Sequence, residues 1–309
     1  MSTPDQAPAV YAGVDIGGTT TQVVLCDPAR LAVVAALEVP TPAAAGGTAM
    51  VRAALDALAA LLAPDTPRLL GVGVGAAGLV DTDTGRILVA SDSFTDWAGF
   101  PVTATLRAAL DVPVFLDNDV NAFLRGEVTG GAVTGEPYVL GMTLGTGVGG
   151  ALWLDGALFD GPHGAAGEIG HVPGFGSLPC TCGGRGHLET VASGRSVAAR
   201  YADRTGRVRT ALEVAEAADG GDLDAVEVFR AAGTAIARAL LITAGVLDIT
   251  TTVIGGGVSR AWHLLQPAIT SALSAEPPVS GRELKVLRSQ LGPHAVAVGA
   301  ASRARSELS

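Results

Sequence analysis

The sequence has little cysteine, little positive charge and no long apolar run. Its 3 cysteines are an odd number, so they do not form the disulfide framework of a small secreted domain. Only 20 Lys and Arg stand against 30 Asp and Glu, and the net charge of −10 without a basic run argues against a nucleic-acid or anionic-membrane surface. No stretch is typical of a membrane-spanning helix, and no basic, apolar leader begins the chain. We therefore expect a soluble cytoplasmic protein with no nucleic-acid or membrane partner.

Apolar residues are plentiful, at 48% of 309 residues, which is enough for two packed lobes. Strand-like and helix-like patterns alternate along the chain, which is typical of an α/β fold. We expect a hairpin over 11–26, then helices over 48–62 and 103–110 between strands over 70–74 and 112–116. A second series follows, with helices over 120–128, 222–247 and 295–308, one starting near 259, and strands over 138–143, 151–154 and 251–254.

Three glycine-rich turns are candidates for phosphate binding. Glycine lets backbone N–H groups approach a phosphate closely, and a nearby carboxylate can hold Mg²⁺ or its waters. The first turn contains Asp15, Gly17, Gly18, Thr19, Thr20 and Thr21; the second contains Gly145, Thr146 and Gly147; the third is Gly255, Gly256 and Gly257. The first turn is equally compatible with an ordinary hairpin turn. The second is neither a Walker A loop nor a dinucleotide fingerprint, because it has no lysine and strand follows it.

A polar cluster ends the strand expected over 112–116 and precedes a helix, where open α/β sheets place ligands. Phosphoryl transfer to an alcohol needs an acceptor for the hydroxyl proton, and one acid here suits that role. The alternative is that Asp117, Asn118 or Asp119 only caps the helix.

The segment over 167–189 combines thiols, imidazoles and carboxylates. Two thiolates and two imidazoles are a donor set that suits tetrahedral Zn²⁺. The candidate metal ligands are His171, Cys180, Cys182 and His187. The flanking Glu168 and Glu189 are poor partners for these thiolates and are better suited to accepting hydrogen bonds from sugar hydroxyls. The remaining cysteine, Cys26, lies in an apolar strand and is interpreted as a buried thiol.

Taken together, these motifs resemble those of the ROK family, the repressor, open reading frame and kinase group of sugar kinases in the actin-like ATPase superfamily. The three turns resemble its two phosphate loops and its adenosine-contacting turn, and Asn118-Asp119 resembles its catalytic pair. Glu168 to His171 fits its Glu-x-Gly-His motif. Cys180 to Glu189 fits its Cys-x-Cys-Gly-x-x-Gly-Cys-x-Glu motif at every position except His187.

The resemblance implies a two-lobed actin-like (ribonuclease H-like) α/β fold with a sugar and ATP cleft between the lobes. It implies an ATP-dependent hexokinase of the glucokinase type, with catalytic Mg²⁺ and structural Zn²⁺. Asp119 would be the general base, and the sugar would contact Gly78, Asn118, Asp119, Glu168, His171 and Glu189. The turn residues listed above would hold ATP. One nitrogen of His171 would bind zinc while the other donates to a sugar hydroxyl.

The departure at His187 replaces a thiolate with an imidazole, which is also a competent zinc ligand. The formal charge of the zinc site rises from −1 to 0, so we expect weaker metal retention with the same fold. The alternatives are that His187 is an exposed loop residue of a metal-free segment, or that Cys180 and Cys182 form a disulfide, which one intervening residue disfavours.

The expected lobes are residues 1–117 plus 293–309, and residues 118–292 with the zinc motif. The favoured activity is transfer of the γ-phosphate of ATP to the 6-hydroxyl of a glucose-like hexose, by a homodimer or homotetramer. An amino-sugar kinase is the alternative, favoured if Asp92 faces the pocket and pairs with an ammonium group. Other rivals are a sugar-responsive repressor, disfavoured because ten residues before Tyr11 are too few for a DNA-binding head, and a non-catalytic sugar sensor. His163 and Arg185 are expected to be solvated loop residues outside the site.

Overall fold

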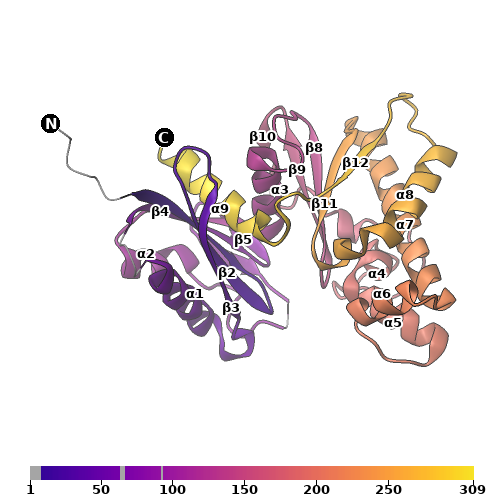
Figure 1. Cartoon of the computed structure of the whole chain (residues 1–309), viewed down its shortest axis with the longest axis horizontal. Coiled ribbons are helices and arrows are strands. Elements are labelled where there is room, and N and C mark those ends of the chain that lie inside the picture. The colour runs from indigo at the N-terminus through magenta and orange to yellow at the C-terminus, as the bar shows by residue number, and fades with distance from the viewer. Residues whose placement is uncertain (1–7, 63–66, 92) are drawn as a thin grey trace. The chain divides into compact units, whose positions relative to one another are not determined.

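The computed structural model describes residues 8–62, 67–91 and 93–309. Contacts divide the chain into two compact units (Figure 1). Unit 1 comprises Met1–Gly135, Gly161–Ala165 and Gln290–Ser309, and unit 2 comprises Glu136–Asp160 and Ala166–Ser289. Unit 1 thus continues past the boundary expected at residue 118, because the helix that follows packs against the sheet of unit 1 and against the C-terminal helix. Asp92 lies outside the described residues.

Unit 1 is built on a five-stranded sheet with the order β3-β2-β1-β4-β7. The strands are β1 (Ala9–Ile16), β2 (Thr20–Cys26), β3 (Val33–Pro40), β4 (Arg68–Ala76) and β7 (Val114–Asn118). The first two pair antiparallel, as the predicted hairpin requires, and β4 pairs parallel with both β1 and β7. A separate hairpin joins β5 (Leu79–Asp81) to β6 (Arg86–Val89).

Helices cover both faces of this sheet. They are η1 (Ala43–Ala45), α1 (Gly47–Leu62), α2 (Val102–Leu110), α3 (Asp119–Gly130), η4 (Gly292–His294) and α9 (Ala295–Glu307). In Figure 1, α1 and α2 lie on one face of the sheet and α9 on the other. The helix α9 packs very closely, because a Cβ added at Gly13 or Gly73 would collide with the carbonyl groups of Ala297 and Ala300. The helix α9 therefore covers one face of the sheet, and it also packs against α3, which follows β7.

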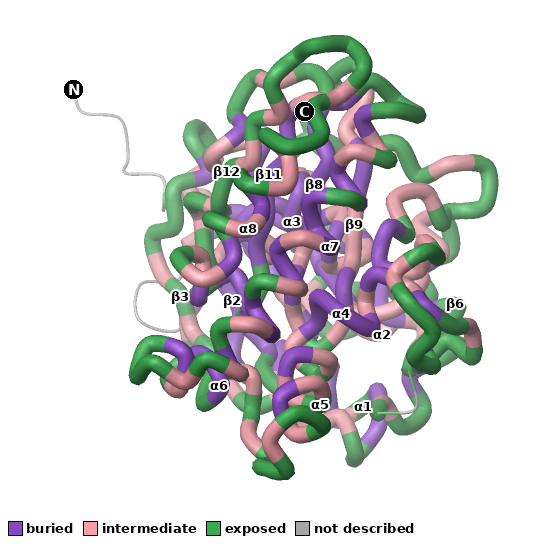
Figure 2. Tube along the Cα trace, turned by 90° about the vertical axis from the view of Figure 1, so that its right-hand side faces the viewer, coloured by how far each residue is buried: buried purple, intermediate pink, exposed green. Residues whose placement is uncertain are grey.

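Unit 2 is also built on a five-stranded sheet, with the order β10-β9-β8-β11-β12. The strands are β8 (Val139–Leu144), β9 (Val148–Leu154), β10 (Ala157–Leu158), β11 (Thr251–Gly255) and β12 (Lys285–Arg288). The central strands β8 and β11 are almost wholly buried (Figure 2). The helices are η2 (Ile169–His171), α4 (Glu189–Ala192), α5 (Gly194–Thr205), α6 (Ala211–Asp219), α7 (Leu223–Leu247), η3 (Gly257–Ala261) and α8 (Trp262–Ala275).

The helix predicted to start near residue 259 is preceded by a short 3-10 helix, η3, and its α-helical part begins only at Trp262. Gly256, immediately before η3, has a φ of +86°, and a Cβ there would collide with the main chain of Leu144. The third glycine turn is therefore wound tightly against the end of β8. In the part of the chain that the structure describes, no helix has both the length and the apolar character needed to cross a membrane.

Candidate active site and metal centre

Asn118 ends β7 and caps α3. Its Oδ1 accepts hydrogen bonds from the backbone N–H groups of Val120 (2.8 Å) and Asn121 (3.2 Å), while its Nδ2 donates to the carbonyl oxygen of Gly78 (2.9 Å). The capping alternative therefore holds for Asn118 among the three candidates. The side chain of Asn118 is thus bonded to Gly78, and both residues were predicted to contact the substrate. One amide hydrogen of Asn118 is not used in these bonds.

Asp119 is the first residue of α3, and its Oδ1 lies 3.0 Å from its neighbour's backbone nitrogen at Val120. The partial positive charge of a helix N-terminus favours an ionised carboxylate. A half-exposed carboxylate in this position is able to accept a proton from a bound hydroxyl.

The turn that contains Gly78 is fixed from two sides. Gly78 has a φ of +110°, and a Cβ there would collide with the carbonyl of Val89, so only glycine fits. The buried Trp97 donates from Nε1 to the carbonyl oxygen of Ala77 (3.0 Å). Sequence reasoning did not assign Trp97 this supporting role, although a tryptophan in a polar loop is a signal that could have found it.

Asp15 lies at the end of β1, in register with Gly75 of β4, which is itself in register with Asp117 of β7. Protein surrounds its carboxyl group, and this desolvation raises the pKa of Asp15 to about 8, with the carboxylates of Asp119 and Glu38 adding to the shift. Asp15 is therefore mostly protonated at neutral pH. A divalent cation bound nearby would favour its ionised form.

The raised pKa predicts a pH-dependent effect of Asp15→Asn on stability. A folded-state pKa of about 8, against the ordinary aspartate pKa of 3.8, means that the wild type becomes less stable as the pH rises between these values. The contribution of Asp15 to the free energy of unfolding falls by up to about 1.4 kcal/mol per pH unit in this range, and it is constant above pH 8. Asparagine does not titrate, so the variant should gain stability relative to wild type across this range. Urea unfolding of both proteins at pH 5, 6, 7 and 8 measures the difference. If the free energy of unfolding depended on pH in the same way in the wild type and the variant, the raised pKa of Asp15 would be contradicted.

A buried ion-pair group supports the β7–α3 junction. The side chain of Asp117 is 1% exposed and lies 3.3 Å from Arg303 of α9 and 3.5 Å from Arg125 of α3. Its Oδ1 also accepts from the backbone N–H of Asn118 (3.0 Å). This group ties Asn118 and Asp119 to α3 and to the C-terminal helix.

The first glycine turn joins β1 to β2 in unit 1. The backbone N–H of Gly17 donates to the carbonyl of Thr20 (3.1 Å), and Gly18, Thr19 and Thr20 are exposed. Thr21, by contrast, is fully buried, and its hydroxyl is 2.7 Å from that of Thr41. The structure therefore leaves the hydroxyls of Thr19 and Thr20 accessible to a ligand and directs that of Thr21 into the protein.

The second and third glycine turns meet in unit 2. The backbone N–H of Gly145 donates to Gly147 (2.9 Å), and that of Gly194, at the start of α5, donates to Gly145 (2.8 Å). A Cβ added at Gly194 would also contact Val258 of η3, beside Gly257. Two glycine turns next to the start of a helix are the kind of backbone arrangement that binds phosphate oxygens.

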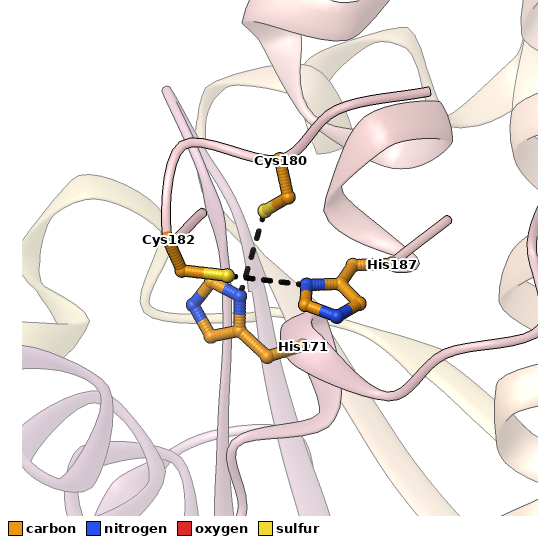
Figure 3. A group of neighbouring side chains, drawn as sticks. All are labelled: His171, Cys180, Cys182 and His187. Atoms are coloured by element: carbon orange, nitrogen blue, oxygen red, sulfur yellow. Dashed lines mark hydrogen bonds between the residues drawn. The ribbon is translucent and has the colours of Figure 1, made fainter. Parts of the chain in front are cut away.

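The predicted metal ligands come together in unit 2 (Figure 3). One ligand atom from each of the four residues lies within 4.8 Å of the others. Cys180 Sγ is 3.7 Å from His171 Nδ1, and Cys182 Sγ is 3.3 Å from His187 Nδ1. Tetrahedral bonds of zinc to sulfur and nitrogen place neighbouring ligand atoms about 3.3–3.8 Å apart, so the donor set and spacing fit this ion. The cysteines are free thiols rather than a disulfide, and His187 is half-buried and points into the cluster.

The loop around the cluster turns sharply. The backbone N–H of Cys180 donates to Gly184 (2.8 Å), and that of Gly183 donates back to Cys180 (3.0 Å). Arg185 donates to the carbonyl of Ser177 (2.9 Å), so it braces this loop rather than contacting the cluster. His163 is exposed, as expected.

His171 presents its two ring nitrogens to different partners. Nδ1 faces Cys180, whereas Nε2 lies 3.9 Å from Oε2 of Glu168, whose side chain is 55% exposed. A metal bound at Nδ1 would place the proton on Nε2 and direct it toward the same space as the Glu168 carboxylate. The second predicted carboxylate, Glu189, is more enclosed: its Oε2 accepts from the backbone N–H of Val148 (3.0 Å) and its Oε1 from the hydroxyl of Thr181 (3.0 Å).

The comparisons with known proteins agree with this arrangement. The sequence model of the ROK family matches residues 11–307. The chain is 37% identical over 278 residues to a glucokinase of Halalkalibacterium halodurans, covering 83% of each chain. It is 33% identical over 287 residues to an N-acetyl-D-glucosamine kinase of Shigella flexneri, covering 87% of this chain and 89% of the relative. The crystal structure of a ROK family glucokinase from Streptomyces griseus in complex with glucose and AMPPNP superposes with a TM-score of 0.85 at 30% identity, covering 96% of this chain and 99% of that one.

These likenesses identify the fold as the predicted two-lobed actin-like ATPase fold, an α/β architecture that hosts nucleotide-dependent phosphotransferases. Within that class, the chain belongs to the ROK family.

Proposed function

We propose that this protein transfers the γ-phosphate of ATP to the 6-hydroxyl of glucose. The observation that carries the proposal is the β7–α3 junction, where Asp119 begins a helix beside Asn118 and its bond to Gly78. A carboxylate fixed at a helix N-terminus, next to an amide that is itself held in place, suits a base that accepts the hydroxyl proton.

The enzyme class is a sugar kinase phosphotransferase, and its substrate class is a hexose. Glucokinases among the relatives support glucose, and the ATP analogue in the Streptomyces griseus complex supports ATP as phosphoryl donor. In this proposal Asn118, Glu168, His171 and Glu189 hold sugar hydroxyls, and the three glycine turns hold ATP.

An amino-sugar kinase is the second candidate. The N-acetyl-D-glucosamine kinase from Shigella flexneri covers most of this chain at 33% identity, so the family scaffold is compatible with an acylated amino sugar. Glucosamine and kanosamine belong to the same alternative. The sensor alternative is less favoured, because Asp119 and the glycine turns are all present.

The metals have separate proposed roles. Mg²⁺ would accompany ATP, and the carboxyl group of Asp15 is an oxygen donor of the kind that it prefers. Zn²⁺ would bind His171, Cys180, Cys182 and His187 and hold the imidazole of His171 in one orientation. When bound, Mg²⁺ supplies charge stabilisation to the transferred phosphoryl group. We further infer a cytoplasmic homodimer or homotetramer, as the family resemblance implies.

The test is a coupled ADP-release assay with Mg-ATP across glucose, mannose, fructose, glucosamine, kanosamine, N-acetylglucosamine and N-acetylmannosamine. Turnover should be fastest with glucose, and 6-deoxyglucose should not be phosphorylated. A preference for an amino sugar would replace glucose with the second candidate. No turnover on any sugar, from folded and metal-loaded protein, would contradict the kinase proposal.

His187→Cys is expected to strengthen zinc retention. A third thiolate changes the formal charge of the zinc site from 0 to −1, and release of zinc to a chelator should slow by about tenfold. A chromophoric chelator measures this rate. His163→Cys is the matched control, since it adds a thiol at an exposed histidine outside the cluster. Equal rates for the two variants would remove His187 from the proposed ligand set.

A further inference from the structure

Glu189 contacts two parts of the proposed site at once. Its Oε2 accepts from the backbone N–H of Val148, which directly follows the second glycine turn, and its Oε1 accepts from the hydroxyl of Thr181, which lies between two metal-ligand cysteines. Both bonds are 3.0 Å long. A Cβ added at Gly147 would collide with the same carboxylate, so the side chain is packed directly against the turn.

The main chain of Glu189 reinforces the contact. Its carbonyl oxygen accepts a hydrogen bond from the hydroxyl of Ser196 (2.6 Å), which lies in the first turn of α5. Gly194, at the start of α5, donates to Gly145 at the other end of the glycine turn (2.8 Å). The turn over 145–147 is thus fixed at both ends by the segment that begins at Glu189.

The metal cluster reaches the turn by a second route. A Cβ added at Gly170, which precedes His171 in η2, would collide with the carbonyl of Val148. The backbone of Val148 is therefore held at its N–H by Glu189 and covered at its carbonyl by the helix that carries a metal ligand. Movement of the metal loop would be transmitted to this residue by direct contact.

We propose that Glu189 and Thr181 are positioning residues for the turn over 145–147, which joins the metal loop and the nucleotide site into one structural unit. The inference deepens the proposed function, in which that turn binds the phosphates of ATP and the cluster binds zinc. The two sites are then coupled. Because coupling free energies are reciprocal, a bound nucleoside triphosphate slows loss of the metal and a bound metal tightens nucleotide binding.

Thr181→Val tests the bridge, because valine keeps the shape of the side chain and removes the hydroxyl. We expect the dissociation constant for Mg-AMPPNP, measured by calorimetry, to rise about three- to tenfold, the range that loss of one hydrogen bond produces. The KM for glucose should change by less than about twofold. Mg-AMPPNP should slow zinc release to a chelator in the wild type, and Thr181→Val should lose most of this protection.

Thr243→Val is the matched control, since the hydroxyl of Thr243 donates only to Ala239 within α7 of the same unit. A raised KM for glucose with unchanged nucleotide affinity in Thr181→Val would overturn the proposal and leave Glu189 a sugar ligand alone. Zinc release that is indifferent to the nucleotide in the wild type would overturn the coupling. If the protein phosphorylates no sugar, the proposed function is wrong, and if it holds no zinc, the proposed metal site is wrong. In either case the calorimetric comparison of Thr181→Val with Thr243→Val still decides whether Thr181 and Glu189 position the nucleotide turn.

Discussion

Asp119→Asn should slow phosphoryl transfer by about 10²- to 10⁴-fold, the usual contribution of a general base. Asparagine has nearly the same shape, and its amide oxygen can still accept from the backbone N–H of Val120, so the fold and the bond between Asn118 and Gly78 should persist. The loss should therefore appear in kcat, with the KM values for sugar and ATP changed much less. Steady-state kinetics with Mg-ATP and the preferred sugar measure both parameters.

Asp111→Asn is the control for this experiment. Asp111 is an exposed aspartate of the same unit that ends α2 with a φ of 50°, a conformation that asparagine tolerates. It should leave kcat unchanged. If Asp119→Asn retained wild-type turnover while Asp111→Asn behaved as expected, another group would have to accept the hydroxyl proton.

Cys180→Ala should remove the metal and destabilise unit 2. Cys180 is the buried member of the cluster, and its loss leaves only three of the proposed ligands. We expect zinc content to fall close to zero and the free energy of unfolding to drop by at least about 2 kcal/mol, a small part of the ~10–16 kcal/mol of structural zinc binding in small domains. Activity should fall about 10- to 100-fold, because the imidazole of His171 would no longer be held.

Elemental analysis and thermal unfolding measure these effects, with Cys26→Ala as the control. Cys26 is fully buried in β2, and burial, with the nearby Asp27 carboxylate, raises its pKa to about 12, so it is an inert thiol far in sequence from the cluster. Its loss should cost packing energy but leave zinc content unchanged. A metal-free wild type, or a Cys180→Ala variant that keeps its zinc, would contradict the proposed centre.

The elements that the sequence predicted well are those whose signal is local. The β1–β2 hairpin and α7 have a clear local pattern of apolar residues, and the four proposed metal ligands lie within a short segment with recognisable spacing. The turn hydrogen bonds that join Cys180 to Gly183 and Gly184 keep Cys180, Cys182 and His187 close together.

Other elements depend on partners far away in the sequence. The strand β3 was not predicted from the sequence; it is an edge strand that pairs with β2, and its mostly apolar residues are exposed or half-exposed. The helices α5 and α6 carry many polar residues, and they are stabilised by caps at Ser193 and Thr210 and by packing on α7.

The supporting contacts of the site were also beyond sequence reasoning. The ion pair of Asp117 with Arg303 and the hydrogen bond of Trp97 to Ala77 arise only once the sheet and α9 have formed. A carboxylate such as Glu189 can be recognised from its motif, but its bond to Val148 depends on how β9 begins. Motifs thus gave the candidate reacting groups, while the groups that hold them could be found only in the structure.

The close packing of α9 sets an order of events during synthesis on the ribosome. Unit 1 contains the N-terminal strands, yet its apolar cluster around Tyr11, Val24 and Cys26 is closed by Ala297 and Ala301 of α9. These alanines emerge after every residue of unit 2 has been made. One face of the nascent β1–β2–β3 sheet therefore remains uncovered while unit 2 is translated. This exposed apolar face is where a chaperone has the longest time to bind.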